Sequence, residues 1–169
     1  MSKFTTYQLG EIYKSVSTTT AGTPVNSNGI NLLNSLLIPA NTFAAGDILT
    51  IQGMVSKDNA GSTYVPYFYW NTSASLTGAI LIATGVAGAT TGRNIMLYRR
   101  LQILTANGTG NASYVFSTTD SANSDLNFMG GAGNTLAINW TSAGYIILAG
   151  SRISSLDTLT GQWIIVSNF

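Results

Sequence analysis

The chain contains neither cysteine nor histidine, and charged residues make up only 8% of its 169 residues. The missing residue types exclude disulfides, Cys/His zinc sites, thiol nucleophiles and every catalytic triad that depends on histidine. Seven Lys and Arg against six Asp and Glu leave a formal charge of +1, so no strong electrostatic field attracts other molecules. We therefore expect neither nucleic acid nor an anionic membrane as a partner.

Long hydrophobic runs are also missing. The longest weakly polar run, residues 78–89, falls well short of the roughly 18 apolar residues that a membrane helix needs. The first 14 residues lack an apolar core followed by a cleavage site, so we expect no secretory signal.

Uncharged polar residues take the place of charge. Serine, threonine and asparagine supply close to a third of the chain, beside 45% hydrophobic and 10% aromatic residues. Disordered chains are poor in aromatic and β-branched residues, so this composition predicts a folded β protein.

From residue 30 onward the apolar residues follow a period of two, interrupted at short intervals by turn formers. The pattern predicts an all-β protein, an antiparallel two-sheet sandwich or jelly roll spanning residues 29–169. Residues 1–28, which end in a Ser/Thr/Gly/Pro-rich stretch, are predicted to form an N-terminal arm and linker. The expected strands are 32–38, 47–56, 64–71, 79–83, 94–104, 112–117, 135–141, 145–152 and 158–167.

The strand at residues 64–70 is apolar or aromatic on both faces. A sandwich strand buries one face in its own core, so the second face needs another partner. Pro66 cannot donate a ladder hydrogen bond, which favours a sheet edge or a bulge. We expect a subunit contact here, or alternatively cover by the N-terminal arm; the predicted contact residues are Tyr64, Tyr67, Phe68, Tyr69 and Trp70.

Candidate catalytic and metal-binding groups are few. Asp47 and Asp58 are expected to be turn formers. A hydrolase pair at Asp120 and Asp125, or a weak calcium site in the same segment, is a minor alternative to a polar surface loop. We therefore predict no enzymatic activity and no cofactor or metal site.

Three tryptophans and one arginine remain to be placed. Trp140 and Trp163 lie in strands and are expected in the core, although they and Trp70 could stack on sugar rings if exposed. Arg99 falls on the apolar face of its strand. It is predicted to pair with an aspartate, to be satisfied at a subunit contact, or to be displaced by a bulge.

Three sequence blocks, taken in order, resemble segments that recur in bacteriophage virion proteins. They are Leu37–Ile51 (LIPANTFAAGDILTI), Tyr69–Ala83 (YWNTSASLTGAILIA), and a C-terminal set made of Ile138–Trp140, Tyr145–Ile147 and Leu159–Ile164. The resemblance covers roughly residues 30–169.

The resemblance implies a jelly-roll domain, commonly trimeric, on the surface of a phage particle as a capsid decoration, head fibre or tail-fibre tip. It implies self-association and contact with other virion proteins such as the capsid shell, and no catalytic residues. The alternative is a tail-fibre receptor-binding module that recognises host-surface glycan. The arm would provide the anchor, with Tyr7, Leu9, Ile12 and Tyr13 as its apolar residues.

Overall fold

The computed structural model describes residues 14–58, 63–85, 94–105, 112–115, 134–152 and 158–168. These residues form strands and no helix, so the predicted all-β class is confirmed. The strands are β1 (Ser15–Thr18), β2 (Gly29–Ile38), β3 (Ile48–Lys57), β4 (Tyr64–Asn71), β5 (Ile80–Thr84), β6 (Asn94–Thr105), β7 (Ala112–Val115), β8 (Asn134–Leu136), β9 (Gly144–Arg152) and β10 (Leu159–Asn168).

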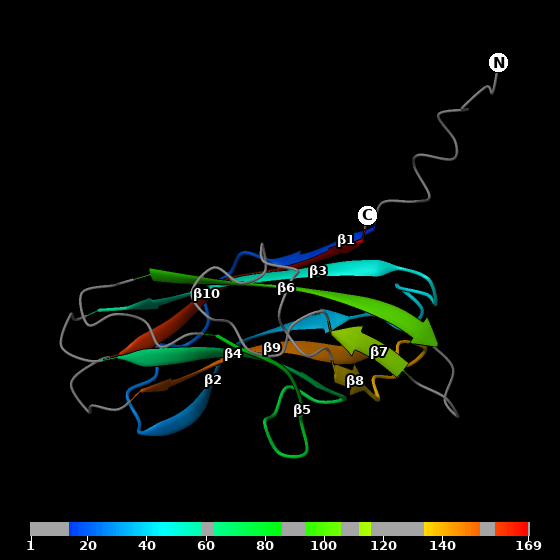
Figure 1. Cartoon of the computed structure of the whole chain (residues 1–169). Helices are drawn as coiled ribbons and strands as arrows, with labels where there is room; N and C mark the ends of the chain where they lie inside the picture. The colour runs from blue at the N-terminus through cyan, green and yellow to red at the C-terminus, as the bar shows by residue number, and fades with distance from the viewer. Residues whose placement is uncertain are drawn as a thin grey trace, which may run out of the picture.

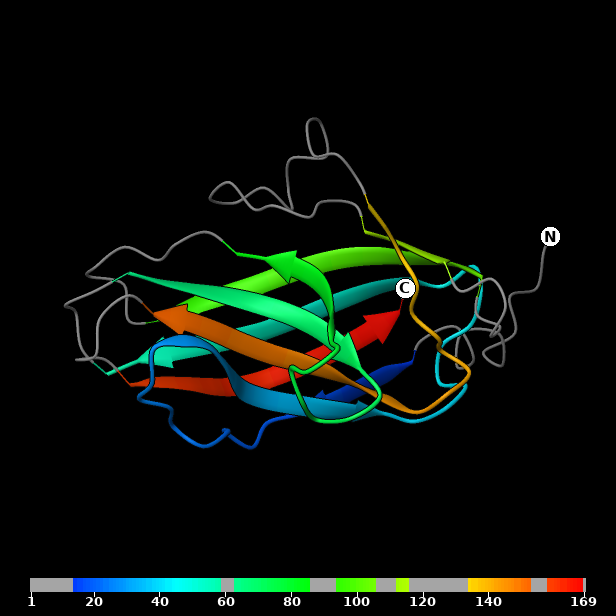
Figure 2. The same cartoon turned by 90° about the horizontal axis from the view of Figure 1, so that it is seen from below.

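Two antiparallel sheets pack face to face as a β-sandwich (Figure 1). The six-stranded sheet has the order β1-β10-β3-β6-β7-β8, and the four-stranded sheet has the order β2-β9-β4-β5. Figure 2 shows the four-stranded sheet crossing in front of the longer strands of the other sheet.

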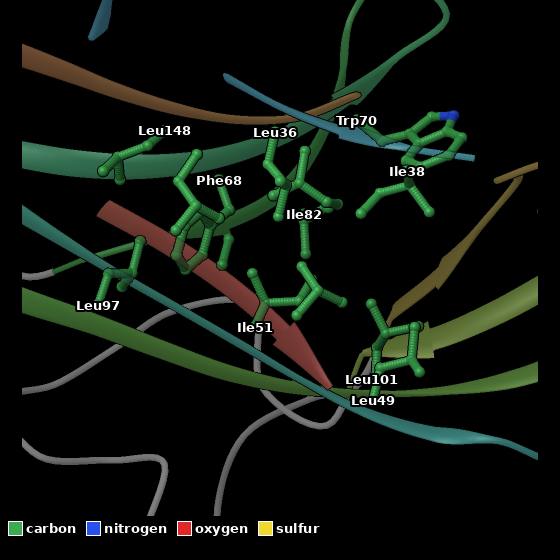
Figure 3. Close-up of a cluster of buried hydrophobic side chains, with 14 of the residues drawn as sticks. Leu36, Ile38, Leu49, Ile51, Phe68, Trp70, Ile82, Leu97, Leu101 and Leu148 are labelled. Atoms are coloured by element: carbon green, nitrogen blue, oxygen red, sulfur yellow. The ribbon is translucent and has the colours of Figure 1, made fainter. Parts of the chain in front are cut away.

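The period-two pattern places one set of side chains from each strand in the core, as predicted. Leu49 and Ile51 in β3 and Leu97 and Leu101 in β6 face inward, and all four are 1% exposed or less. Phe68 and Leu148 approach them from the four-stranded sheet (Figure 3). Burial of these facing rows is the main force that holds the two sheets together.

An aromatic cluster closes one end of the core. The ring centroids of Trp70 and Trp140 lie 4.8 Å apart, and Phe43 packs edge-on against Trp140 at 5.9 Å. Gly144 lies against Trp70 so closely that a Cβ atom there would be 2.3 Å from its ring. The predicted core position of Trp140 is confirmed, because it is 1% exposed.

The folded domain begins earlier than the sequence predicts. Strand β1 pairs with β10 from Ser15 opposite Ser167 to Thr18 opposite Ile164, so it belongs to the six-stranded sheet rather than to an arm. Gly22 and Val25 then donate backbone hydrogen bonds of 2.8 Å to Gly161 and Leu159 in the same strand. The predicted arm is therefore corrected: β1 has a single apolar side chain, Val16, which packs against the core, and one apolar residue in a Ser/Thr-rich stretch gives no period-two signal.

Buried polar side chains connect the two sheets. Asn34 donates from Nδ2 to the carbonyls of Thr20 (2.9 Å) and Gly161 (3.1 Å), which ties β2 to the opposite sheet. Arg99 is fully buried on the inner face of β6, and its guanidinium donates to the carbonyls of Tyr98 (2.6 Å) and Thr84 (3.0 Å). Hydrogen bonds within the chain therefore hold this cation on its predicted apolar face.

Pro66 does not mark a sheet edge, because β4 pairs with both β9 and β5. Its ladder with β5 runs only from Tyr67 to Trp70, and the Pro66 carbonyl accepts a last hydrogen bond of 2.8 Å from the Gly85 amide. The proline therefore lies where the pairing with β5 ends. The register shift in this ladder, between Phe68 and Tyr69, adds one residue, Ile82, to β5, so the bulge predicted as the alternative does not lie at Pro66.

Candidate functional site

The five aromatic residues predicted as a subunit contact divide between the two faces of β4. Tyr64, Phe68 and Trp70 are 0%, 0% and 3% exposed and fill the core of this chain, so they are not accessible to a second chain. Tyr67 and Tyr69 point to the outside of the four-stranded sheet and are half-buried. Only these two of the five remain available for a contact between subunits.

The outer tyrosines are held in place along β9. Tyr67 lies opposite Ala149, and its hydroxyl is 3.1 Å from the Ser151 hydroxyl, so its ring extends along β9 beyond its pairing partner. Tyr69 packs beside it, with ring centroids 6.0 Å apart at an angle of 34°. Burial raises the pKa of Tyr69, and the neighbouring Tyr67 raises it further.

Apolar side chains on neighbouring strands extend this surface, which we call the tyrosine face: Tyr67, Tyr69 and Tyr145 with Leu37 and Leu81. Leu37, in the edge strand β2, lies opposite Tyr145 and is 48% exposed. Leu81, in the other edge strand β5, lies opposite Tyr69 and is 43% exposed. Tyr145, Leu37 and Leu81 are not predicted from the sequence, because their place beside β4 depends on strand pairing.

The tyrosine face carries no charge. Arg152 is the only charged residue in β2, β4, β5 and β9, and it is 5% exposed on the inward-facing side. Its guanidinium donates to the Ser27 carbonyl (2.9 Å) and to Asn26 Oδ1 (2.6 Å). An aromatic surface without Lys, Asp or Glu has the composition of the buried centre of a protein interface.

Trp163 lies on the outer face of the six-stranded sheet, so its predicted core position is wrong. The register of β10 against β3 shifts between Gly161 and Trp163, which adds one residue, Gln162, to β10. One extra residue reverses the direction of every following side chain. Trp163 is therefore half-buried and points outward, while Ile164 fills the core.

A row of apolar side chains continues from Trp163 across the sheet. Trp163 lies opposite Met54 in β3, and Met54 lies opposite Met96 in β6, which is 60% exposed. We call Trp163, Met54 and Met96 the indole row. Gln162 next to it donates from Nε2 to the Ser56 hydroxyl at 2.6 Å.

Of the described carboxylates, Asp47 has the predicted turn role, whereas Asp58 joins two segments that are far apart in the sequence. Asp47 Oδ2 accepts a hydrogen bond of 2.9 Å from the Ala44 amide, and Asp58 Oδ1 accepts one of 2.7 Å from the Thr158 amide. Asp120 and Asp125 lie outside the described residues. So do the residues of the predicted anchoring arm, Tyr7, Leu9, Ile12 and Tyr13.

Within the described ranges, no three or more acidic side chains gather into a group that could hold a metal ion. The same part of the chain offers no helix with the length and hydropathy to cross a membrane.

No protein-family model matches this sequence, and no curated protein matches it significantly.

Proposed function

We propose that this chain is a non-enzymatic structural protein of a bacteriophage particle, a homotrimer displayed on the surface as a capsid decoration or short head fibre. The sequence blocks that resemble virion proteins suggest the particle. The observation that supports self-association is the uncharged tyrosine face on the outside of the domain. The described buried cations Arg99 and Arg152 are hydrogen-bonded within the chain.

The proposal includes a jelly-roll topology. A jelly roll has eight strands that pair as in a long rolled hairpin: the first with the eighth, the second with the seventh, the third with the sixth and the fourth with the fifth. With the β7–β8 hairpin set aside as an insertion, this chain has the four pairs β1–β10, β2–β9, β3–β6 and β4–β5. The pairs β10–β3 and β9–β4 then join them into two sheets. This agreement supports the fold that the sequence resemblance implies.

A closed trimer needs two different patches on each subunit, because contacts around a threefold axis are heterologous. The tyrosine face offers two different flanks, Leu37 on the β2 side and Leu81 on the β5 side. In the proposed trimer, the Leu37 flank of one subunit packs against the Leu81 flank of the next. Such packing removes exposed apolar surface from water.

The test is the mass of the full-length protein by size exclusion with light scattering. We expect a species of three times 17.7 kDa. Leu81→Asp and Leu37→Asp should each give a monomer, because an unpaired charge would be buried in the contact. The control Leu104→Asp changes a leucine that is 46% exposed on the opposite face, and it should remain trimeric. A monomeric wild-type protein would contradict the proposal.

The arm is tested separately. Because β1 belongs to the sandwich, the appropriate truncation removes residues 1–13 and leaves Ser15–Thr18 intact. The shortened protein should keep its trimeric mass but lose co-sedimentation with capsids that lack this protein. Undiminished co-sedimentation would show that the anchor lies elsewhere.

A further inference from the structure

We propose that the outer face of the six-stranded sheet binds an uncharged saccharide, with Trp163 as its stacking platform. A binding site of this kind goes beyond the structural role proposed above. It is carried by the bulge in β10, by the indole row, and by the polar side chains around that row.

The bulge at Gln162 gives the indole its orientation. Without the extra residue, Trp163 would follow Gly161 into the core, and the strand would present an ordinary polar outer face. Among the described residues the indole makes no ring contact and no side-chain hydrogen bond. The indole is half-buried, so its outward-facing part, together with an N–H group that has no side-chain partner, is what it can offer to a ligand that is apolar on one side and polar at its edge.

The indole row crosses the sheet over a length that suits a short sugar chain. Its members come from the neighbouring strands β10, β3 and β6. Adjacent strands lie about 4.8 Å apart, so the strip spans about 10 Å. A short stretch of sugar chain could place the C–H faces of consecutive rings on Trp163 and on the methionine side chains.

Uncharged hydrogen-bonding groups border the strip. The Gln162 amide is held by the Ser56 hydroxyl, which fixes the position of a donor and an acceptor beside the indole. Gln52 lies opposite Ile165 and Tyr98 on the same face, and its amide makes no hydrogen bond within the described residues. Side-chain amides can both donate to and accept from sugar hydroxyls.

The charge of this face favours a neutral ligand. In β1, β3, β6 and β10 the charged residues are Lys57, Arg99 and Arg100, and the first two are buried on the inner side. The Arg100 Nε donates to the Tyr98 hydroxyl at 2.9 Å, at the far end of the site from the indole. An anionic polymer would find one cation here, whereas a neutral glycan needs none.

The position of this face also separates it from the proposed trimer contact. The two sheets form the two layers of the sandwich (Figure 1), and the burial patterns place the tyrosine face on the outside of one sheet and the indole row on the outside of the other. Two patches on opposite sides of a subunit cannot both point toward one threefold axis. If the tyrosine face of one subunit packed on the indole row of the next, the subunits would form an open array rather than a closed trimer. In a trimer formed around the tyrosine face, Trp163 therefore faces outward. This orientation rests on the proposed function, whereas the chemistry of the face does not.

The test uses the full-length protein on an array of neutral and anionic bacterial polysaccharides. Maltohexaose, cellohexaose and chitohexaose are then titrated while acrylamide quenching of tryptophan is followed. Trp70 and Trp140 are buried, so quenching in the described fold reports mainly on Trp163. We expect binding of a neutral glycan, with protection of Trp163. Trp163→Ala should weaken the apparent affinity at least tenfold and Trp163→Phe less, while the distant Leu104→Ala control leaves it unchanged.

Three outcomes would overturn the site: no neutral glycan bound on the array, undiminished binding by Trp163→Ala, or a changed oligomeric mass of Trp163→Ala. The last would make the indole row a contact between copies of this chain. A monomeric wild-type protein whose glycan binding still depends on Trp163 would refute the proposed trimer and support the saccharide site, so the two failures are distinguishable.

Discussion

Replacing Gly144 with alanine tests the packing of the aromatic cluster. The new Cβ atom would lie 2.3 Å from Cζ2 and 2.7 Å from Cη2 of Trp70, whereas ordinary contacts begin at 3.4 Å. Either the ring or the start of β9 must therefore move by about 1 Å. Trp70 has little room to move, because it is 3% exposed and packs against Trp140.

The expected cost follows from two opposing effects. Overpacking a well-filled core costs about 1–3 kcal/mol. The lost backbone freedom of glycine in the unfolded chain returns about 0.4–1 kcal/mol. An approach of 2.3 Å is a severe overlap, so the upper part of the overpacking range, about 2–3 kcal/mol, applies. We therefore expect Gly144→Ala to lower the free energy of unfolding by about 1–2.5 kcal/mol.

Urea unfolding at a fixed protein concentration measures this change. A double-mutant cycle with Trp70→Phe provides the control, because phenylalanine lacks the part of the indole that the new methyl group would meet. The two changes should couple by at least about 0.5 kcal/mol in the direction of rescue. A neutral or stabilising Gly144→Ala, or strictly additive changes, would refute the reasoning.

Three further predictions concern the core and its polar groups. Phe68→Ala should lower the free energy of unfolding by about 3–5 kcal/mol in urea, because it empties a fully buried position between the sheets; a loss below about 1 kcal/mol would contradict this packing. Arg99→Met should cost about 1–3 kcal/mol in the same assay, because the Thr84 carbonyl loses a donor, and unchanged stability would argue against that bond. Burial raises the pKa values of Tyr64 and Tyr69, so both side chains stay neutral in the folded protein at pH values at which the tyrosines of the unfolded chain ionise. Stability should be complete below about pH 10 and fall above it, as followed by tyrosinate absorbance during alkaline unfolding; simple titration of both residues near pH 10 in the native protein would disprove this.

Much of the fold could be predicted from local sequence alone. The alternation of apolar residues in β3 and β6 predicts both the strand ranges and the inward-facing side chains, because a strand with one buried face requires that pattern. Trp163 marks the limit of this reasoning. A bulge changes the direction of a side chain without changing the composition of the strand, so only the pairing of β10 with β3 shows it.

The candidate surfaces were harder to predict for a related reason. The sequence places Tyr67 and Tyr69 together on one face of β4, but both faces of this strand are apolar, so the sequence does not show which face is the core. Leu37, Tyr145 and Leu81 come from separate parts of the chain and become their neighbours only through the sheet. The short strand β1 was missed because four residues with a single apolar side chain carry little periodic signal.

The pairing of β1 with β10 determines how the domain can carry a mechanical load. A tether that acts through residues 1–13 transmits force into the sandwich at Lys14, whose carbonyl accepts a backbone hydrogen bond of 2.9 Å from Asn168. A pull along the axis of β1 loads its paired residues together, in shear, with the Gly22 and Val25 bonds behind them. A pull across the strand would instead peel the same pairs apart one by one. If residues 1–13 carry the proposed anchor, the attachment would therefore last longer under a pull along β1 than under a pull across it.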